Sequence, residues 1–344
     1  MQITAPAIPL DSTVVVIGAN GYIGLETTEK LLSAGFRVRG TVRDVEKNSS
    51  WMHALFDKRW PGKFEVVKVE DFTVKGAFDE AFAGASAVIY VSVPIIIDLD
   101  PAKNIHPIVS GTINTLEAAA KAGIKRYTLA ASSKGVETTV YNKPHHLTTK
   151  MFNHDAILQA SCGTFGADNF FSKALTVYSA GRALSEIAFW SWVEENKPPF
   201  VANCLVLDGQ FGRVMDKEHT NSTAAMLKSC ADGRWDSVVG DLAYVTDVQD
   251  SARLFVATVT LPSIQNERLF AYCRHNMSWN DLRQVLREID PALVSGEDLA
   301  VEGRDLSNAS EAIGRAEEVL KMVKGEGFSS VDSIFRDWVR TYVQ

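Results

Sequence analysis

The sequence is poor in cysteine, and its cysteines are not spaced like metal ligands or redox pairs. The four, Cys162, Cys204, Cys230 and Cys273, lie far apart and form no CxxC motif. Disulfide-stabilised secreted domains are cysteine-dense, and zinc sites need closely spaced ligands. We therefore expect reduced thiols in a cytoplasmic protein, and neither disulfides nor a cysteine metal site.

Long hydrophobic runs and basic clusters are also missing. The longest apolar stretch, residues 85–97, is interrupted by Ser86, Ser92 and Pro94 and is too short to cross a bilayer. Residues 1–12 lack the basic and apolar regions of a secretory signal. The formal net charge is −7, and no local run of Lys or Arg offsets it. The sequence therefore disfavours a membrane span and a nucleic-acid partner, and it carries no signal for oligomeric state.

What the sequence does contain is an alternation of short apolar strands and amphipathic helices. The run TVVVI at 13–17 is typical of a parallel strand that is buried on both faces. Further strands are expected at 36–42, 64–69, 87–93, 126–131 and 201–207. Helices are expected at about 22–34, 50–59, 75–83, 108–122 and 177–196. This alternation predicts an α/β fold with a Rossmann-type, doubly wound parallel sheet.

The second part of the chain has a less regular pattern. A long polar segment follows Ser132 and reaches Lys173, and a loop of that length is usually functional. The chain ends in two helical patterns, at 309–324 and 331–342. We expect residues 1–200 to be mainly the dinucleotide-binding domain. Residues 201–344 are expected to return partly to the sheet and to form a smaller, interleaved C-terminal substrate-binding part.

The glycine-rich sequence GANGYIG lies directly between the first strand and the first helix. Its glycines allow a tight turn, close approach of a pyrophosphate, and close packing of helix on strand. The helix start then offers free N–H groups and its positive dipole end to phosphates. We predict that this turn binds a dinucleotide. The residues expected to contact it here are Gly18, Asn20, Gly21, Tyr22, Ile23 and Gly24.

The end of the second strand decides which dinucleotide is bound. NAD-selective sites place an acidic residue there to accept from the ribose 2′-hydroxyl. In this sequence the strand ends in Arg43, with Arg39 and Lys47 nearby. A guanidinium suits a 2′-phosphate by its charge and its planar fork of donors. The pattern favours NADP(H) over NAD(H), although Asp44 offers a carboxylate to the hydroxyl instead.

These motifs resemble the extended short-chain dehydrogenase/reductases of the NAD-dependent epimerase/dehydratase family. Within it the sequence is most similar to fungal NADPH-dependent aldehyde and ketone reductases, relatives of dihydroflavonol and cinnamoyl-CoA reductases. The similar segments span nearly the whole chain. They are GANGYIG at 18–24, VRGTVRD at 38–44, WPGKFEVVKVED at 60–71, GTINTLEAAA at 111–120, RYTLAASS at 126–133, VYSAGRALSE at 177–186 and EENKPPF at 194–200.

The resemblance implies which residues carry the chemistry. In this family a Tyr exchanges a proton with the substrate oxygen, a Lys four residues later promotes its ionisation and binds the nicotinamide ribose, and a Ser positions the substrate. The matching residues are Ser132, Tyr178 and Arg182. Arg182 keeps the positive charge of the Lys but does not readily release a proton. Two further departures are Ala130-Ala131, where the family has Thr-Ser, and Leu207, where it has Pro.

The resemblance also assigns the remaining cofactor contacts. Asp71 and Phe72 match the residues that hold the adenine. Val91, Ser92 and Val93 match the strand end beside the phosphates and ribose. Tyr178, Arg182 and Leu207 match positions near the nicotinamide.

Three histidines, His145, His146 and His154, lie in the polar segment before Tyr178. A metal site would need a better-placed third ligand and a carboxylate partner. We therefore expect pocket or surface histidines and no metal site.

The sequence supports one leading function and two alternatives. The leading hypothesis is NADPH-dependent reduction of a small aldehyde, ketone or keto ester by hydride transfer, with Tyr178 as proton donor. The altered Arg182, Ala130-Ala131 and Leu207 leave open a non-reductive epimerase, dehydratase or biosynthetic enzyme. A non-catalytic NADP(H)-binding sensor also remains open.

Overall fold

A computed structural model describes residues 3–91, 98–166, 169–220, 222–235, 242–272, 276–300 and 303–344. Its centre is a seven-stranded sheet in the order β10-β7-β5-β4-β1-β2-β3, in which every neighbouring pair is parallel. The strands are β1 (Thr13–Ile17), β2 (Arg37–Val42), β3 (Phe64–Lys68), β4 (Ala87–Tyr90), β5 (Arg126–Ser132), β7 (Val201–Leu207) and β10 (Arg268–Ala271). The order reverses beside β1, which confirms the predicted doubly wound sheet.

Strand β1 shows why its sequence is apolar throughout. Alternate side chains point to opposite faces of a sheet. Val14 and Val16 belong to one hydrophobic cluster, whereas Val15 and Ile17 belong to another. Both faces of this strand are therefore buried, as expected for a central parallel strand.

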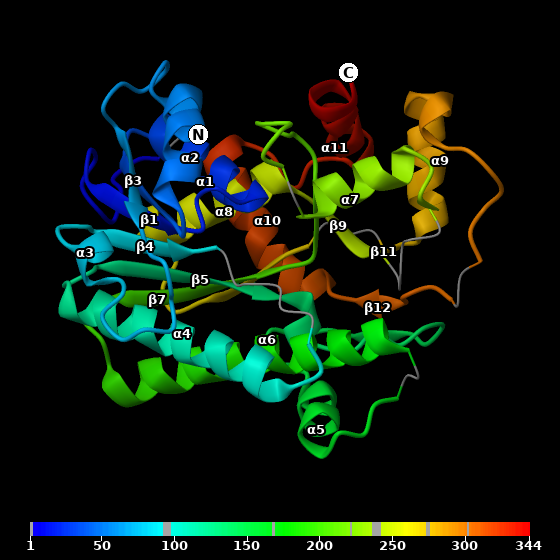
Figure 1. Ribbon diagram of the computed structural model, residues 1–344, viewed down its shortest axis with the longest axis horizontal. Helices are drawn as coiled ribbons and strands as arrows, with labels where there is room; N and C mark the ends of the chain where they lie inside the picture. The colour runs from blue at the N-terminus through cyan, green and yellow to red at the C-terminus, as the bar shows by residue number, and fades with distance from the viewer. Residues whose placement is uncertain are drawn as a thin grey trace.

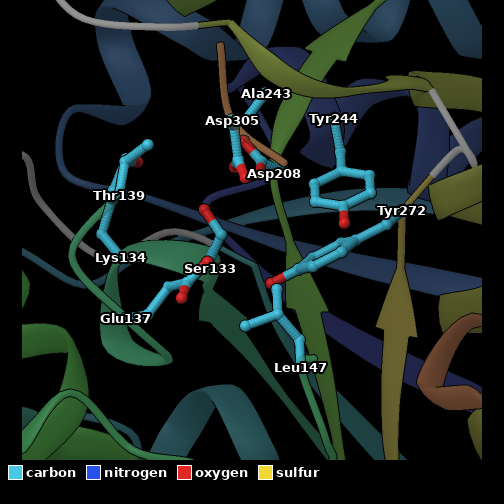
Figure 2. Close-up of a pocket in the computed structure, with 10 residues that line it drawn as sticks. All are labelled: Ser133, Lys134, Glu137, Thr139, Leu147, Asp208, Ala243, Tyr244, Tyr272 and Asp305. Atoms are coloured by element: carbon cyan, nitrogen blue, oxygen red, sulfur yellow. The ribbon is translucent and has the colours of Figure 1, made fainter. Parts of the chain in front are cut away.

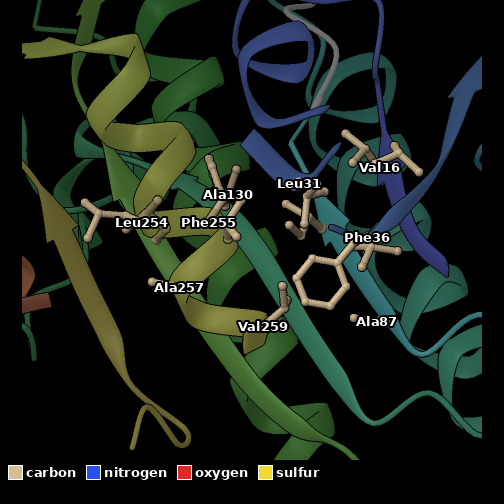
Figure 3. Packing of buried hydrophobic residues seen from close by; sticks show 14 of the residues in the cluster. Val16, Leu31, Phe36, Ala87, Ala130, Leu254, Phe255, Ala257 and Val259 are labelled. Carbon is tan, nitrogen blue, oxygen red and sulfur yellow. The ribbon is translucent and has the colours of Figure 1, made fainter. Parts of the chain in front are cut away.

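Helices cover the two faces of the sheet (Figure 1). The first cluster holds side chains from α1 (Tyr22–Ser33), α2 (Val45–Phe56), α8 (Val248–Thr260) and α10 (Ser310–Lys324). Figure 3 shows Leu31 of α1 and Leu254 of α8 in this cluster, with Val16 and Ala130 of the sheet. The second cluster holds side chains from α3 (Asp79–Phe82), α4 (Pro101–Lys121) and α6 (Phe170–Asn196).

The C-terminal part adds a small sheet and a core of its own. Strands β8 (Gly209–Phe211), β9 (Ala243–Asp247) and β11 (Asn276–Met277) pair in the order β11-β9-β8. Helices α7 (Ser222–Ala231), α9 (Trp279–Ile289) and α11 (Val331–Trp338) surround them, and a π-helical turn (Val339–Val343) follows. The core between these elements is rich in large side chains, among them Trp235, Trp279, Phe335 and Trp338.

The long polar segment after Ser132 is not a single loop, so that prediction was wrong. It contains a 3-10 turn, η1 (Ser133–Gly135), a short strand β6 (His145–His146) and the helix α5 (His154–Cys162). Helix α5 is defined by its caps. The Asn153 side chain accepts from Ala156 N at 2.9 Å, and Gly163 ends the helix with a φ of +66°. Strand β6 pairs with β12 (Ser307–Asn308) from the far end of the chain.

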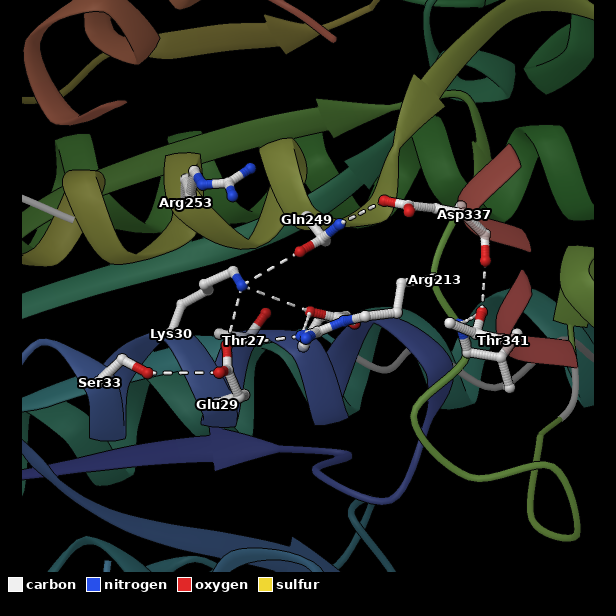
Figure 4. Close-up of polar contacts among 12 residues, drawn as sticks. Thr27, Glu29, Lys30, Ser33, Arg213, Gln249, Arg253, Asp337 and Thr341 are labelled. Carbon is white, nitrogen blue, oxygen red and sulfur yellow. Dashed lines mark hydrogen bonds and ion pairs between the residues drawn. The ribbon is translucent and has the colours of Figure 1, made fainter. Parts of the chain in front are cut away.

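A polar network joins α1 to the C-terminal part (Figure 4). Arg213 donates two hydrogen bonds, of 2.7 and 2.6 Å, to the buried carboxylate of Glu26. Lys30 donates to the amide oxygen of Gln249 at 3.3 Å, and Gln249 donates to Asp337 at 3.4 Å. The helix that follows the glycine turn is therefore tied to α8 and α11.

Two compositional expectations can be compared with the described residues. Cys162, Cys204 and Cys230 form no disulfide there, and Cys273 lies outside the described residues. Among the described helices, none has the length and apolar character needed to cross a membrane.

Candidate active site

The glycine turn leaves the N-terminus of α1 uncovered. Gly18 has a φ of +81°, in the left-handed region that favours glycine. A Cβ atom at Gly24 would lie 2.1 Å from the Gly18 carbonyl oxygen, so this position requires glycine. Gly21 is the N-cap and contributes no capping side chain. The first-turn N–H groups, including those of Tyr22 and Ile23, therefore remain available to an anion.

Two side chains of the turn hold it in place. Asn20 donates to the side-chain oxygen of Asn48 in α2 at 3.0 Å. The Tyr22 ring is buried, and its hydroxyl donates to the Gly212 carbonyl at 3.0 Å. These contacts engage both side chains within the protein.

The end of β2 carries exposed positive charge. Arg43 and Lys47 are exposed and form no ion pair within the part of the chain that the structure describes. The Asp44 carboxylate caps α2 by accepting from Lys47 N at 3.0 Å. Arg39 is bound to Glu65 at 2.6 Å and has a structural role. Arg43 is therefore the guanidinium available to a 2′-phosphate at this edge.

Residues after β3 form a closed turn. The Asp71 carboxylate accepts from the Thr73 hydroxyl at 2.6 Å and from its N–H at 2.8 Å, and these bonds lower the Asp71 pKa. The ring of Phe72 packs where a side chain at Gly111 would otherwise lie, since a Cβ there would be 2.1 Å from the ring. The predicted adenine contacts are thus held against α4.

The ends of β4 and β7 provide the next predicted positions. Val91 is half-buried, and its N–H donates to the Ile17 carbonyl at 3.2 Å. Ser92 and Val93 lie outside the described residues. Leu207 is buried at the end of β7 and pairs in register with the end of β5.

The three predicted catalytic residues come from β5 and α6. Ser132 is the last residue of β5, and its hydroxyl accepts from Lys134 N at 3.3 Å. Tyr178 and Arg182 lie one turn apart on α6. The turn η1 packs closely on α6 because Gly135 has no side chain; a Cβ there would lie 3.1 Å from a backbone nitrogen of α6. This contact brings the end of β5 against the helix that carries Tyr178 and Arg182.

Arg182 is anchored but not fully hydrogen-bonded. It is 6% exposed, and its Nη2 donates to the Ala130 carbonyl of β5 at 2.6 Å. Its Nε is buried and has no partner among the described residues. The hydroxyl of Tyr90, at the end of β4, is likewise buried without a partner there. Burial raises the Tyr90 pKa, and the nearby Arg182 charge opposes this rise. Both groups lie near the carboxyl ends of β4 and β5, the side of a parallel sheet at which ligands bind.

A cleft opens beyond the ends of β5, β7 and β10 (Figure 2). Ser133 and Lys134 of η1, Asp208 after β7, and Tyr272 after β10 line it. The C-terminal part contributes Tyr244 and Asp305, and the segment after η1 contributes Glu137 and Thr139. The Tyr244 and Tyr272 rings stack with their centroids 4.9 Å apart. The cleft therefore has an aromatic wall and a strongly acidic one.

Burial raises the pKa of several groups in this cleft, among them Asp208 and Tyr272. Burial raises the pKa of Asp208 to about 6, while the charge of Lys134 opposes the rise. Asp208 accepts from Gly209 N at 2.7 Å. Burial also raises the pKa of the Tyr272 hydroxyl well above its ordinary value, and the Asp208 charge adds to this.

None of these cleft residues is among those predicted from the sequence. Asp208 directly follows an apolar strand, and the rule that ligands bind at the carboxyl ends of parallel strands would have indicated it. Asp305 had no such signal. It reaches the cleft because Tyr141 bridges to Asp305 and β6 pairs with β12.

The chain is similar in sequence to NAD(P)H-binding proteins and fungal reductases. A family model described as NAD(P)H-binding matches residues 18–161. The chain is 31% identical to the ketoreductase adrE of Penicillium rubens, covering 83% of this chain and 82% of that one. It is 28% identical to aldehyde reductase 2 of Sporidiobolus salmonicolor over 98% of both chains. It is also 29% identical to the NAD-dependent epimerase/dehydratase terH of Aspergillus terreus, covering 96% of this chain and 97% of that one.

Solved structures share the fold. Gre2 of Candida albicans, crystallised with NADPH, superposes with a TM-score of 0.81 at 20% identity, covering 97% of this chain and 99% of that one. Vestitone reductase from alfalfa superposes with a TM-score of 0.72 at 18% identity, covering 96% and 97% of the two chains. On these similarities the chain belongs to the extended short-chain dehydrogenase/reductases, a family of NAD(P)H-binding oxidoreductases.

Proposed function

We propose that the protein is an NADPH-dependent reductase of a small aldehyde, ketone or keto ester. The observation that carries the proposal is the placement of Tyr178 and Arg182 one turn apart on α6, against the end of β5 that carries Ser132. The names of the relatives, which are an aldehyde reductase and a ketoreductase, support the same reaction class.

The residues present fit NADPH. The positive φ of Gly18 and the close contact of Gly24 with the Gly18 carbonyl make the turn tight, and the uncovered start of α1 suits the pyrophosphate. Arg43 and Lys47 would hold the 2′-phosphate, because Asp44 is used as a helix cap. Further contacts are proposed from Asn20, Gly21, Tyr22, Ile23, Asp71, Phe72, Val91 and Leu207.

The chain's own groups would then act on the substrate oxygen. When bound, NADPH supplies the hydride that reduces the carbonyl carbon. Tyr178 donates the proton to the oxygen, and Ser132 positions that oxygen by a hydrogen bond. Arg182 holds a fixed positive charge that stabilises the resulting tyrosinate, and its unpartnered Nε is a donor for the nicotinamide ribose. We further propose that residues 201–344 complete the substrate pocket, since Asp208, Tyr244 and Tyr272 line the cleft.

A panel of carbonyl compounds tests this proposal. NADPH absorbance is followed with aldehydes, ketones and keto esters, and alcohol formation is measured in the same samples. We expect alcohol equal to the NADPH consumed, with NADH much less effective. Tight NADPH binding without turnover of any carbonyl would contradict the proposal and would favour a sensor.

A second candidate is a proton-transfer reaction without net reduction, such as an epimerisation or dehydration. Lys134 and Asp208 favour it, because they place an amine and a half-buried carboxylate in the cleft beside Ser133. A relative with an epimerase/dehydratase name is consistent with it. Conversion of a substrate with no change in total NADPH would establish this reaction. Loss of that conversion in Asp208→Asn, with Tyr178→Phe still active, would assign it to the cleft pair.

A further inference from the structure

We propose that Glu137, His145 and Asp305 form a binding site for one divalent transition-metal cation, for which Zn²⁺ is the natural probe. Each residue offers one ligand atom, and these atoms lie within 4.8 Å of one another. The three residues come from the segment after η1, from β6 and from the segment before β12. The sequence alone could not assemble this set, because its third member is more than a hundred residues away.

The histidine is oriented as a metal ligand should be. His145 Nδ1 is 2.9 Å from the Lys143 carbonyl oxygen, which can only accept, so Nδ1 carries a proton. The other nitrogen, Nε2, faces Glu137 Oε2 at 2.7 Å. A backbone acceptor on one ring nitrogen commonly fixes the other toward a metal. A hydrogen bond between Nε2 and the carboxylate requires a proton on one of the two groups, and a bound cation would displace that proton.

The third ligand, Asp305, is held in place by backbone contacts. Asp305 Oδ1 accepts from Ser307 N at 2.7 Å, and the bridge between Tyr141 and Asp305 fixes the main chain. Strands β6 and β12 pair in register, with Ser307 opposite His145. The carboxylate is therefore carried on the strand segment that neighbours the histidine.

A second observation points to a ligand in this place. The Tyr272 hydroxyl is fully buried, has no hydrogen-bond partner among the described residues, and points into the cleft that Glu137 and Asp305 line (Figure 2). A buried hydroxyl is normally paired. A water bound to a metal at this site would supply a partner.

The charge of the cleft favours a cation. Asp208 adds a third carboxylate to those of Glu137 and Asp305, and Lys134 is the one basic residue among those that line the cleft. Buried like charges are costly unless they are neutralised. A divalent cation would offset the excess negative charge without a large change in structure.

The donor set indicates the kind of metal. One imidazole nitrogen and two carboxylate oxygens suit Zn²⁺, which takes three protein ligands and leaves a fourth position open. Mg²⁺ prefers oxygen ligands in octahedral geometry and is expected to bind poorly. Tetrahedral Zn²⁺ places its ligand atoms roughly 3.4 Å apart. To hold Zn²⁺, the 2.7 Å pair of His145 Nε2 and Glu137 Oε2 would have to open, and ligand atoms up to 4.8 Å apart would have to close.

The test is a calorimetric titration of the full-length, chelator-treated protein with Zn²⁺ and, separately, with Mg²⁺. We expect one Zn²⁺ per chain and no Mg²⁺ binding. His145→Gln and Glu137→Gln should each weaken Zn²⁺ binding at least tenfold. His146→Gln is the matched control, because His146 is the exposed next residue on the opposite face of β6. It should bind like wild type.

Circular dichroism melting of each variant separates lost ligands from lost structure. The expected result is unchanged melting without zinc, together with a zinc-dependent rise in melting temperature only in wild type and His146→Gln. The proposal is overturned if wild type binds no zinc, or if His145→Gln, while folded, binds it equally well. Neither outcome bears on the proposed reductase activity, because the titration needs neither NADPH nor substrate.

Discussion

The glycine turn and the cleft beyond Ser132 lie at the same edge of one sheet, yet they are built in different ways. The turn is made of closely packed backbone, and the side chains of Asn20 and Tyr22 form hydrogen bonds with other parts of the protein. The cleft is lined by charged and aromatic side chains that distant segments bring together. Substitution of a side chain therefore alters the cleft more directly than it alters the turn.

Arg182 is tied to the β5 backbone by its bond to Ala130, and its Nε has no partner among the described residues. The chain keeps the glycine turn but departs from the family at Arg182. Substitutions in the two regions can therefore distinguish loss of cofactor binding from loss of the chemical step.

The largest effect is expected at Tyr178. Tyr178→Phe removes the proposed general acid and leaves the ring, so kcat should fall roughly 10²- to 10⁴-fold. The affinity for NADPH should change little, which would separate the reaction site from the turn. Steady-state kinetics and a fluorescence titration of NADPH measure both. Unchanged kcat would remove Tyr178 from the chemistry.

The next effect is expected at Gly24. Gly24→Ala places a Cβ 2.1 Å from the Gly18 carbonyl oxygen, and backbone must move to relieve this overlap. We expect NADPH affinity to fall roughly 100-fold. Gly314→Ala on α10 is the control, since a Cβ there meets nothing within 4 Å. Equal NADPH affinity in both variants would show that the turn is not the cofactor site.

Substitutions at Arg182 test whether its positive charge takes part in the reaction. Arg182→Gln keeps a donor but removes the charge, and the proposal predicts a fall in kcat of roughly 10- to 100-fold. Arg182→Lys, which restores the family residue, should retain much more activity than Arg182→Gln. If Gln and Lys variants behave alike, the charge has no part in the reaction.

A smaller, cofactor-specific effect is expected at Arg43. Arg43→Ala removes one charged partner of the 2′-phosphate, so the KM for NADPH should rise roughly tenfold while that for NADH stays the same. Arg37→Ala, at the opposite end of β2, is a matched control that should affect neither. Equal changes for both nucleotides would argue against 2′-phosphate recognition by Arg43.

The smallest effect is expected at Asp247, the N-cap residue of α8. Burial raises the pKa of Asp247 from 3.8 to about 6, and Asp250 adds to this while Arg253 opposes it. Because the folded-state pKa exceeds the unfolded value, protonated Asp247 contributes stability at low pH that is lost as pH rises from about 4 to 6. Asp247→Asn mimics the protonated form. Above pH 7 its free energy of unfolding should exceed that of wild type by at most about 3 kcal/mol, with no gain near pH 3.5.

Denaturant unfolding across pH measures this difference. Asp250→Asn serves as a contrast. Asp250 pairs with Lys324 and Arg253 at 2.8 Å, so this variant should be less stable than wild type at neutral pH. A loss of stability in Asp247→Asn above pH 7 would contradict the expected sign.

The sheet and the turn could be predicted from sequence because their signals are local. The run at 13–17 is apolar on both faces, and strand, glycines and helix follow one another directly. The predicted start of the helix at 108–122 is too late, because α4 begins at Pro101 and is capped by Asp100. A proline inside it, Pro107, obscured the start.

The cleft could be predicted only in part. Ser132, Tyr178 and Arg182 were found by resemblance, but Glu137 and Asp305 are neighbours only through the pairing of β6 with β12. Each of these strands is two residues long and has no periodicity to detect. Contacts of such high sequence separation are decided by tertiary structure.

The most direct test of the central claim follows the hydrogen itself. The protein is given a carbonyl substrate and NADPH that carries deuterium at the transferable position of nicotinamide C4, and the product is examined by mass spectrometry. The account predicts an alcohol with one deuterium on the former carbonyl carbon, formed in equal amount to the NADP⁺ produced. Product without deuterium, formed while NADPH remains unchanged, would contradict it.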